Sequence, residues 1–160
     1  HLKIGDSLPG FFLRTLRGDA FFLNEPIGVK ATTKCRGILF SFCASWCKPC
    51  KKEIPELSAL YDKYKDSGIF FYLVDVGEDR DTASAFADEI KSPIPMLMDR
   101  HQKAHETVGR PGLPYTILAD STGIVHFINT GFPENTAHEI IEKLEQTIKN
   151  LVDSRAGNSL

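Results

Sequence analysis

The sequence predicts an α/β fold in which a central mixed β-sheet is flanked by helices. Short apolar runs of strand length alternate with amphipathic helical repeats over most of the chain, and this pattern favours parallel strands joined by crossover helices. Near the start and near the end, pairs of apolar runs flank turn residues and predict antiparallel hairpins. The 160 residues are the length of a single domain.

The first predicted element is an N-terminal β-hairpin. The apolar segments 11–13 and 21–23 flank a turn that contains Gly18. Residues 24–36 follow and are predicted to form a loop, because proline and glycine interrupt them.

The remaining elements follow from the spacing of apolar residues. Continuous or alternating apolar runs predict strands, and a spacing of three to four predicts helices. A turn at residues 120–123 joins the last two strands. The predicted strands are 37–43, 69–76, 94–98, 115–119 and 124–129, and the predicted helices are 48–65, 81–91, 101–108 and a last helix that Asn135 or Thr136 caps.

The domain is expected to end with this last helix. Its apolar face runs from Ile140 to Ile148. We place one domain at residues 1–152 and a polar C-terminal tail, which we expect to fray, at residues 153–160.

Charge and hydropathy exclude several function classes. The net charge is −2, and no long run of basic residues indicates binding to nucleic acid or to an anionic membrane surface. No apolar run reaches the roughly 18 residues of a membrane-spanning helix. The chain begins at His1 rather than Met, as in a mature or trimmed product, so an export or anchoring segment could be absent from it.

Three of the four cysteines lie within eight residues, which indicates chemistry rather than a disulfide scaffold. Cys35 and Cys43 flank one predicted strand. Eight strand residues span about 26 Å at ~3.3 Å each, whereas a disulfide needs Cα atoms within ~7 Å. These two cysteines therefore cannot pair with each other.

Cys47 and Cys50 lie where a predicted strand is followed by a helix. At a helix N-terminus, free N–H groups and the helix dipole favour a thiolate. The spacing places Cys50 one turn further on the same face, as a resolving thiol would be. Pro49 fits the first turn of a helix, and the cation of Lys48 favours the thiolate further. The pattern predicts dithiol–disulfide exchange.

Two metal interpretations compete with this one. A zinc knuckle would use the same pair, but zinc knuckles come as two pairs and the chain has only one. The spacing of Cys43, Cys47 and Cys50 also resembles the cluster motif of radical enzymes that use S-adenosylmethionine, which need a larger barrel. Cys43 itself is either a half-buried strand residue or a third thiol for redox or copper chemistry.

The run 40–55, FSFCASWCKPCKKEIP, resembles the active-site segment of the thioredoxin-like thiol–disulfide oxidoreductases typified by TlpA and ResA. Residues 112–116, GLPYT, resemble the cis-proline loop of that family, and residues 120–123 resemble its hairpin turn. The resemblance covers roughly residues 4–150. It implies a thioredoxin-like fold with an N-terminal β-hairpin extension.

The resemblance also implies roles for single residues. Cys47 is then the exposed nucleophile, Cys50 the buried resolving thiol, and Pro114 a cis-proline at which a substrate backbone docks; the alternative for Pro114 is a trans turn proline. Trp46 is expected to shield the thiols or, alternatively, to pack in the core. The residues expected to contact substrate are Trp46, Lys48, Pro49 and Leu113.

The chain departs from relatives at positions near the motif. Ser41 stands where plain thioredoxins have a buried Asp, so we expect Glu53 to exchange a proton with Cys50; the alternative is an exposed helix residue. Cys43 replaces an aromatic residue, and Pro111 replaces an apolar one, so the local cavity should differ in shape.

Other polar residues are expected to have no chemical role. His101 and His105 lie four residues apart and could share a metal ion, but we expect them on a solvated helix face. Asp99, Asp120 and His126 are expected at the surface or in turns. No cofactor and no metal are predicted.

The resemblance implies a reductase of protein disulfides outside the bacterial cytoplasm, periplasmic or membrane-anchored. Its expected partners are a protein disulfide substrate, of the kind found in cytochrome c maturation or oxidase assembly, and a membrane thiol reductant of the DsbD or CcdA type. Nucleic acid is not an expected partner. The alternative is a copper-binding thioredoxin-like metallochaperone that uses Cys43 and Cys47.

Overall fold

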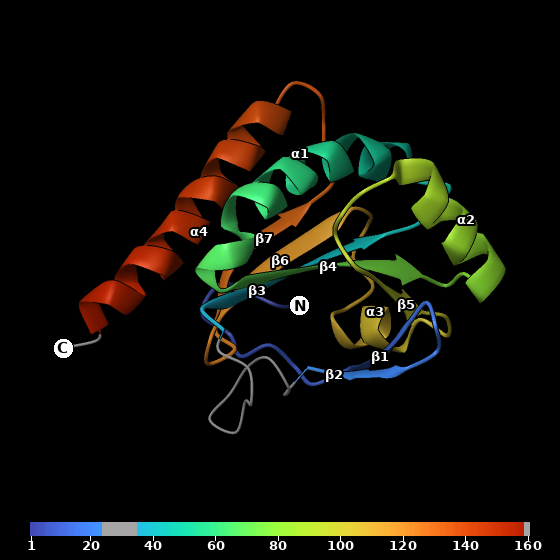
Figure 1. Cartoon of the computed structure of the whole chain (residues 1–160), viewed down its shortest axis with the longest axis horizontal. Helices are drawn as coiled ribbons and strands as arrows, with labels where there is room; N and C mark the ends of the chain where they lie inside the picture. Colours follow the sequence, from blue (N-terminus) through green and yellow to red (C-terminus); the bar gives the residue numbers. More distant parts are fainter. Residues whose placement is uncertain (24–34, 159–160) are drawn as a thin grey trace.

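The computed structural model describes residues 1–23 and 35–158 (Figure 1). These residues form one seven-stranded sheet with the strand order β2-β1-β5-β4-β3-β6-β7. The predicted loop at 24–36 falls almost wholly outside the described residues. The strands are β1 (Phe12–Thr15), β2 (Ala20–Phe22), β3 (Gly37–Cys43), β4 (Ile69–Val76), β5 (Met96–Asp99), β6 (Tyr115–Asp120) and β7 (Val125–Thr130). The helices are α1 (Lys48–Tyr64), α2 (Arg80–Ile90), α3 (Lys103–Thr107) and α4 (Ala137–Asn158), and the 3-10 turn Lys65–Ser67 follows α1.

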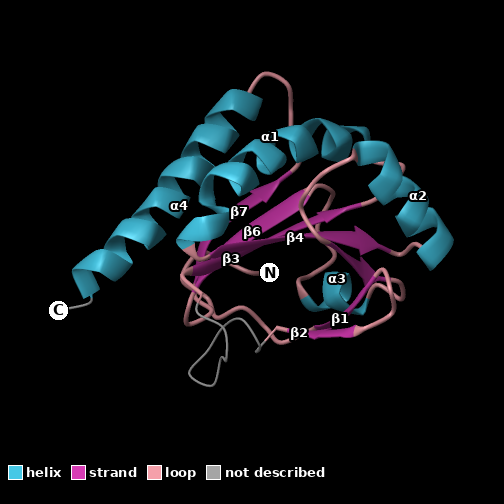
Figure 2. Ribbon diagram, in the orientation of Figure 1, coloured by secondary structure: helices cyan, strands magenta, loops and turns pink. Residues whose placement is uncertain are grey.

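The sheet is mixed, as the sequence predicts. Strands β3, β4 and β5 run parallel, while β1, β6 and β7 pair antiparallel with their neighbours. Helices α1, α2 and α4 cover one face, and α3 lies on the other face (Figure 2). This arrangement confirms the α/β fold class and the N-terminal hairpin, which joins the sheet through β1 and β5.

The last helix is longer than the sequence analysis predicts. It continues to Asn158, beyond residue 152, where we placed the end of the domain. Leu151 is buried, and it packs so closely on Gly37 that a Cβ at that glycine would lie 3.0 Å from Leu151 Cδ1. This contact anchors α4 to the sheet near the end of the predicted domain, and the helix continues from there into the segment that we expected to fray.

Two residues near α3 are buried, although the sequence analysis placed them at the surface. Asp99 is 4% exposed because its carboxylate accepts hydrogen bonds from the backbone N–H groups of Ala104 (3.0 Å) and His105 (2.8 Å). His105 is 8% exposed, and its Nε2 lies 2.7 Å from the carbonyl oxygen of Pro111. The pair therefore anchors α3 against β5, and the expected solvated histidine face is wrong at His105.

Candidate redox site

A disulfide joins Cys47 and Cys50 at the start of α1, with 5.3 Å between their Cα atoms. Cys47 is the N-cap of α1, and its sulfur accepts a hydrogen bond from the backbone N–H of Cys50 at 3.2 Å. Strand β3 ends at Cys43, and a turn closed by the Cys47 N–H and the Ala44 carbonyl (3.1 Å) leads into the helix. The sulfur of Cys47 thus lies where helix N–H groups favour a thiolate.

Both cysteines are enclosed in the oxidised protein. Cys47 is 3% exposed and Cys50 is not exposed. The expectation of an exposed nucleophile is therefore wrong for this state, because both cysteines belong to the buried cluster between the sheet and α1, against which Leu113 packs. Access to the Cys47 sulfur depends on the surface residues around it.

The residues around Cys47 form an exposed rim. Trp46 is 71% exposed, which excludes the core-packing alternative for this indole. Lys48 and Pro49 are also exposed and form the first turn of α1. Trp46 precedes the first cysteine of the disulfide, and Lys48 and Pro49 lie between the two cysteines. All three side chains are exposed to solvent, where another protein could contact them.

Pro114 brings a second segment to the same edge of the sheet. The Leu113–Pro114 peptide bond is cis, as the family resemblance implies, and Pro114 is buried. Strand β6 begins at the next residue and pairs with β3 so that Tyr115 lies opposite Phe42. This register carries the proline to the end of β3, from which the cysteine motif continues.

Glu53 lies inside the protein, one turn beyond Cys50, and is 1% exposed. Its carboxylate accepts hydrogen bonds from the hydroxyl of Ser41 (3.0 Å) and from that of Thr116 (3.1 and 3.2 Å to the two oxygens). Burial raises the pKa of Glu53 to about 7, and the two hydroxyls limit the rise. A carboxyl with this pKa can take up and release a proton near neutral pH.

Thr116 was not identified from the sequence. Ser41 and Thr116 lie opposite each other in the pairing of β3 with β6, and both face α1. The only sequence signal is that Thr116 closes the GLPYT segment.

Cys43 and Asp75 lie side by side at the ends of β3 and β4. Cys43 is fully buried rather than half-buried, because α1 covers this face of β3, and its thiol donates to the Val74 carbonyl at 3.6 Å. Burial raises the pKa of the Cys43 thiol well above its ordinary value, and Asp75 adds to the effect. Both effects disfavour the thiolate of Cys43, which is the reactive form of a thiol.

Asp75 is a buried carboxyl with no hydrogen-bond partner among the described residues. The pKa of Asp75 is raised to about 9, mainly by burial and to a smaller extent by the neighbouring Glu78. The two carboxyls interact without a hydrogen bond of standard geometry. Asp75 is therefore protonated at neutral pH.

Glu78 holds the turn that precedes Cys47. Its carboxylate accepts from the backbone N–H of Ser45 at 2.9 Å and from the Ser45 hydroxyl at 2.6 Å. Burial acts to raise the pKa of Glu78, but Asp75 and the Ser45 donors outweigh it and hold that pKa below its ordinary value. Sequence analysis missed Asp75 and Glu78, although carboxyl groups at or just after the end of a buried parallel strand reach the edge where such sheets carry their sites.

The remaining cysteine lies apart from this site. Cys35 is partly buried, donates to the Gly37 carbonyl at 3.2 Å, and has its pKa raised to about 11 by burial. Cys35 and Cys43 are both free, which confirms that they do not pair with each other. Among the described residues, no group of three His, Cys, Asp or Glu side chains could hold a metal ion.

Comparison with known proteins gives the family. The model of the AhpC/TSA family matches residues 4–128. The chain belongs to this family. It is 32% identical over 148 residues to the thiol-disulfide oxidoreductase ResA of Geobacillus kaustophilus, an alignment that covers 92% of this chain and 79% of that protein. The ResA of Geobacillus thermodenitrificans is also 32% identical, over 90% of this chain and 78% of the relative.

A solved structure supports the same conclusion. The crystal structure of a protein described as a putative thiol:disulfide interchange protein DsbE, from Chlorobium tepidum, superposes with a TM-score of 0.80 at 26% identity and covers 95% of this chain and 99% of that one. Together with the Cys47–Cys50 disulfide, these relatives show that the AhpC/TSA member described here is a thiol–disulfide oxidoreductase. In the described part of the chain, no helix has the length and apolar character needed to cross a membrane.

Proposed function

We propose that this protein reduces protein disulfides by dithiol–disulfide exchange through its Trp-Cys-Lys-Pro-Cys motif. The observation that carries the proposal is the Cys47–Cys50 disulfide at the helix N-terminus, one turn before the buried Glu53. In the reduced protein, the Cys47 thiolate attacks a substrate disulfide, and one substrate thiolate leaves and takes up a proton. The product of this step is a mixed disulfide.

Release of the substrate requires Cys50 to become a thiolate. Its sulfur then attacks Cys47, the bond between Cys47 and the substrate breaks, and the second substrate thiol departs. Two electrons have passed from the dithiol to the substrate, and the Cys47–Cys50 disulfide remains. Because Cys50 is fully buried, and burial disfavours a thiolate, this step needs a proton acceptor, and that acceptor is Glu53.

The substrate is proposed to dock on the edge formed by the cysteine turn and the cis-proline loop. Trp46 offers an exposed apolar surface, and the exposed Lys48 and Pro49 follow Cys47 in the first turn of α1. Leu113 and Pro114 supply the opposite side, since β6 pairs with β3. Lys48 lies in the first turn of α1 and favours the thiolate of Cys47 by its charge.

We further propose an extracytoplasmic location, with a membrane thiol reductant of the DsbD or CcdA type as electron donor and substrates of the cytochrome c maturation or oxidase assembly type. Support comes from the resemblance to ResA and DsbE proteins. Protein disulfides also accumulate mainly in oxidising compartments, where a reductase has substrates.

The copper-binding alternative has weaker support. It requires Cys43 and Cys47 as thiolate ligands, but the Cys43 thiol is fully buried, bonded to the Val74 carbonyl and raised in pKa. The sulfur of Cys47 is shared with Cys50. A copper titration of the Cys50→Ser variant measures this alternative directly, since a copper site built from Cys43 and Cys47 would retain its affinity.

Reduction of insulin disulfides tests the main proposal. The reduced wild type should accelerate insulin precipitation, and Cys47→Ser should abolish the activity. Cys35→Ser is the matched control because that thiol is remote and raised in pKa. A reduction potential near about −270 mV would support a reductant, and a value near about −120 mV would identify an oxidant and contradict the proposed direction.

A further inference from the structure

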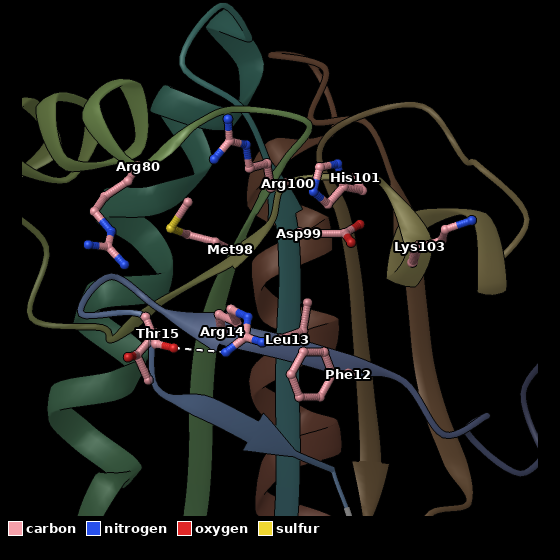
Figure 3. Close-up of a pocket in the computed structure, with 11 residues that line it drawn as sticks. Phe12, Leu13, Arg14, Thr15, Arg80, Met98, Asp99, Arg100, His101 and Lys103 are labelled. Atoms are coloured by element: carbon pink, nitrogen blue, oxygen red, sulfur yellow. Dashed lines mark hydrogen bonds between the residues drawn. The ribbon is translucent and has the colours of Figure 1, made fainter.

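A cavity of about 490 Å³ lies between β1 and the segment that follows β5 (Figure 3). Phe12, Leu13 and Met98 supply apolar surface to it, and Phe12 is 43% exposed. The volume falls within the ~300–1,000 Å³ of typical ligand sites. The cavity is separate from the disulfide site described above.

The cavity carries an excess of positive charge. Arg14, Arg80, Arg100 and Lys103 line it, and Figure 3 shows Arg80 and Lys103 at opposite sides. Among residues 1–23 and 35–158, none of the four forms an ion pair. This concentration of cations stands out in a chain whose net charge is −2.

The nearby carboxylates leave this charge largely unneutralised. Among the described residues that line the cavity, Asp99 is the one carboxylate beside four cations, and its two oxygens accept the backbone N–H groups at the start of α3 rather than pairing with any of these cations. Asp79 has its pKa lowered mainly by hydrogen bonds from Thr82 and only lastly by the charge of Arg100. Arg14 is already engaged by the Gly18 carbonyl and the Phe12 ring, so of these four cations Arg80, Arg100 and Lys103 remain available to an external anion.

The guanidinium groups of two of the cations, Arg14 and Arg80, lie against the turn of the N-terminal hairpin. The backbone of Gly18 has φ +94°, and a Cβ at this position would collide with Nη2 of Arg80. On the other side, Nη1 of Arg14 donates to the Gly18 carbonyl at 2.9 Å. Gly18 thus allows both guanidinium groups to lie against the turn.

A short path connects the cavity to the disulfide. Arg80 follows Glu78 by two residues, Glu78 is hydrogen-bonded to Ser45, and Ser45 precedes Cys47 by two residues. Since each extended residue spans at most ~3.5 Å, Arg80 and Cys47 are within roughly 20 Å of each other. About six residues of an extended peptide cover that distance.

We propose that this cavity binds acidic side chains of the protein substrate within about six residues of its disulfide. The proposal rests on the function proposed above and adds a substrate class to it. Carboxylates match guanidinium groups in charge and geometry, while the stems of Asp and Glu contact the apolar wall. Such a charge pattern also steers an acidic substrate toward the active-site edge.

Binding of a fluorescein-labelled, glutamate-rich peptide without cysteine tests the cavity directly. Fluorescence anisotropy at low salt is measured with the oxidised wild type, with Arg80→Gln/Lys103→Gln, and with Lys65→Gln/Lys149→Gln as a control of equal charge change. The first double variant should weaken binding at least about fivefold, a modest effect because exposed ion pairs contribute little each. The control should retain wild-type affinity, and added salt should weaken wild-type binding.

Equal affinities for the two double variants would overturn the proposal. It would also be overturned if pyrophosphate bound the wild type and not the cavity variant while the glutamate-rich peptide bound neither, since the cavity would then be a small-anion site. Because this peptide has no disulfide, its binding reports on the cavity even if the protein proves not to reduce insulin. A failure to reduce insulin would contradict the proposed function but would leave the assignment of the cavity intact.

A kinetic measurement connects the cavity to turnover. Two peptide disulfides are compared, one flanked by glutamates and the other by glutamines. The wild type should show a higher kcat/KM for the acidic peptide, through a lower KM, and Arg80→Gln/Lys103→Gln should reduce the ratio of the two values toward one. An unchanged ratio in that variant would show that the cavity does not select the substrate.

Discussion

Glu53 and Asp75 are both buried on the face of the sheet that α1 covers, yet they differ in their partners. Glu53 accepts hydrogen bonds from Ser41 and Thr116, whereas Asp75 has no hydrogen-bond partner among the described residues. Burial raises both pKa values, to about 7 for Glu53 and to about 9 for Asp75. The comparison teaches that hydroxyl donors keep one buried carboxyl able to exchange protons at neutral pH, while the other, which lies beside the carboxyl group of Glu78 instead, remains protonated.

The largest expected difference between the two carboxyls is kinetic. Glu53→Gln keeps the shape and removes the proton acceptor, so release of a trapped mixed disulfide should slow by about tenfold or more. Asp75→Asn should change this step far less. Stopped-flow measurements with a model peptide disulfide separate release from the initial attack by Cys47, which should change little in Glu53→Gln.

The pH dependence gives a second readout of the same variant. The wild-type release rate should rise as pH increases through about 7, because Glu53 must be ionised to accept a proton. Equal release rates for the wild type and Glu53→Gln from about pH 6 to 9 would remove Glu53 from the mechanism.

Asp75 is expected to affect stability instead. Its pKa is about 9 in the folded protein and about 4 in an unfolded chain. The folded state therefore binds this proton more tightly, so the contribution of Asp75 to stability is greatest below pH about 4 and is lost as pH rises toward about 9. Asp75→Asn should remove this loss and raise the free energy of unfolding at pH 8 by at least about 1 kcal/mol.

Urea unfolding at pH 4 and pH 8 measures this effect. The stabilisation by Asp75→Asn should be larger at the higher pH, and Asp88→Asn, an exposed change on α2, should show no such difference. A stabilisation that is the same at both pH values would mean that Asp75 is not a protonated carboxyl.

A smaller effect is expected when a partner of Glu53 is removed. Thr116→Val deletes a hydroxyl that favours the ionised form, so the pKa of Glu53 should rise above about 7. The midpoint of the pH profile for release should move upward by up to about one unit. Thr107→Val, which removes an exposed hydroxyl on α3, is the control, and a midpoint that moves downward would contradict the assigned hydrogen bonds.

The smallest effect is expected at Cys43, which lies beside Asp75. Its buried thiol has a raised pKa, so Cys43→Ala should leave insulin reduction within about twofold of the wild type. Cys50→Ala serves as the opposite control and should abolish turnover. Loss of activity in a correctly folded Cys43→Ala protein would show that a third thiol takes part in the exchange.

Local sequence patterns determined most of the elements and the position of the redox pair. The period of apolar residues distinguishes β4 from α1, and the strand–helix junction at Cys47 is visible from the motif alone. These signals act over a few residues, because strand alternation, helix periodicity and capping are local properties. The same signals therefore predicted the α/β class and the cysteine chemistry.

Only the tertiary structure decided which polar residues are buried and what they contact. The register of β3 and β6 brings Ser41 and Thr116 together on Glu53, and Asp99 is buried because it anchors α3. Likewise, only the tertiary structure shows that Leu151, near the end of α4, packs on Gly37 at the start of β3. A side chain's pKa and accessibility depend on residues distant in sequence, so neither periodicity nor motif spacing could determine them.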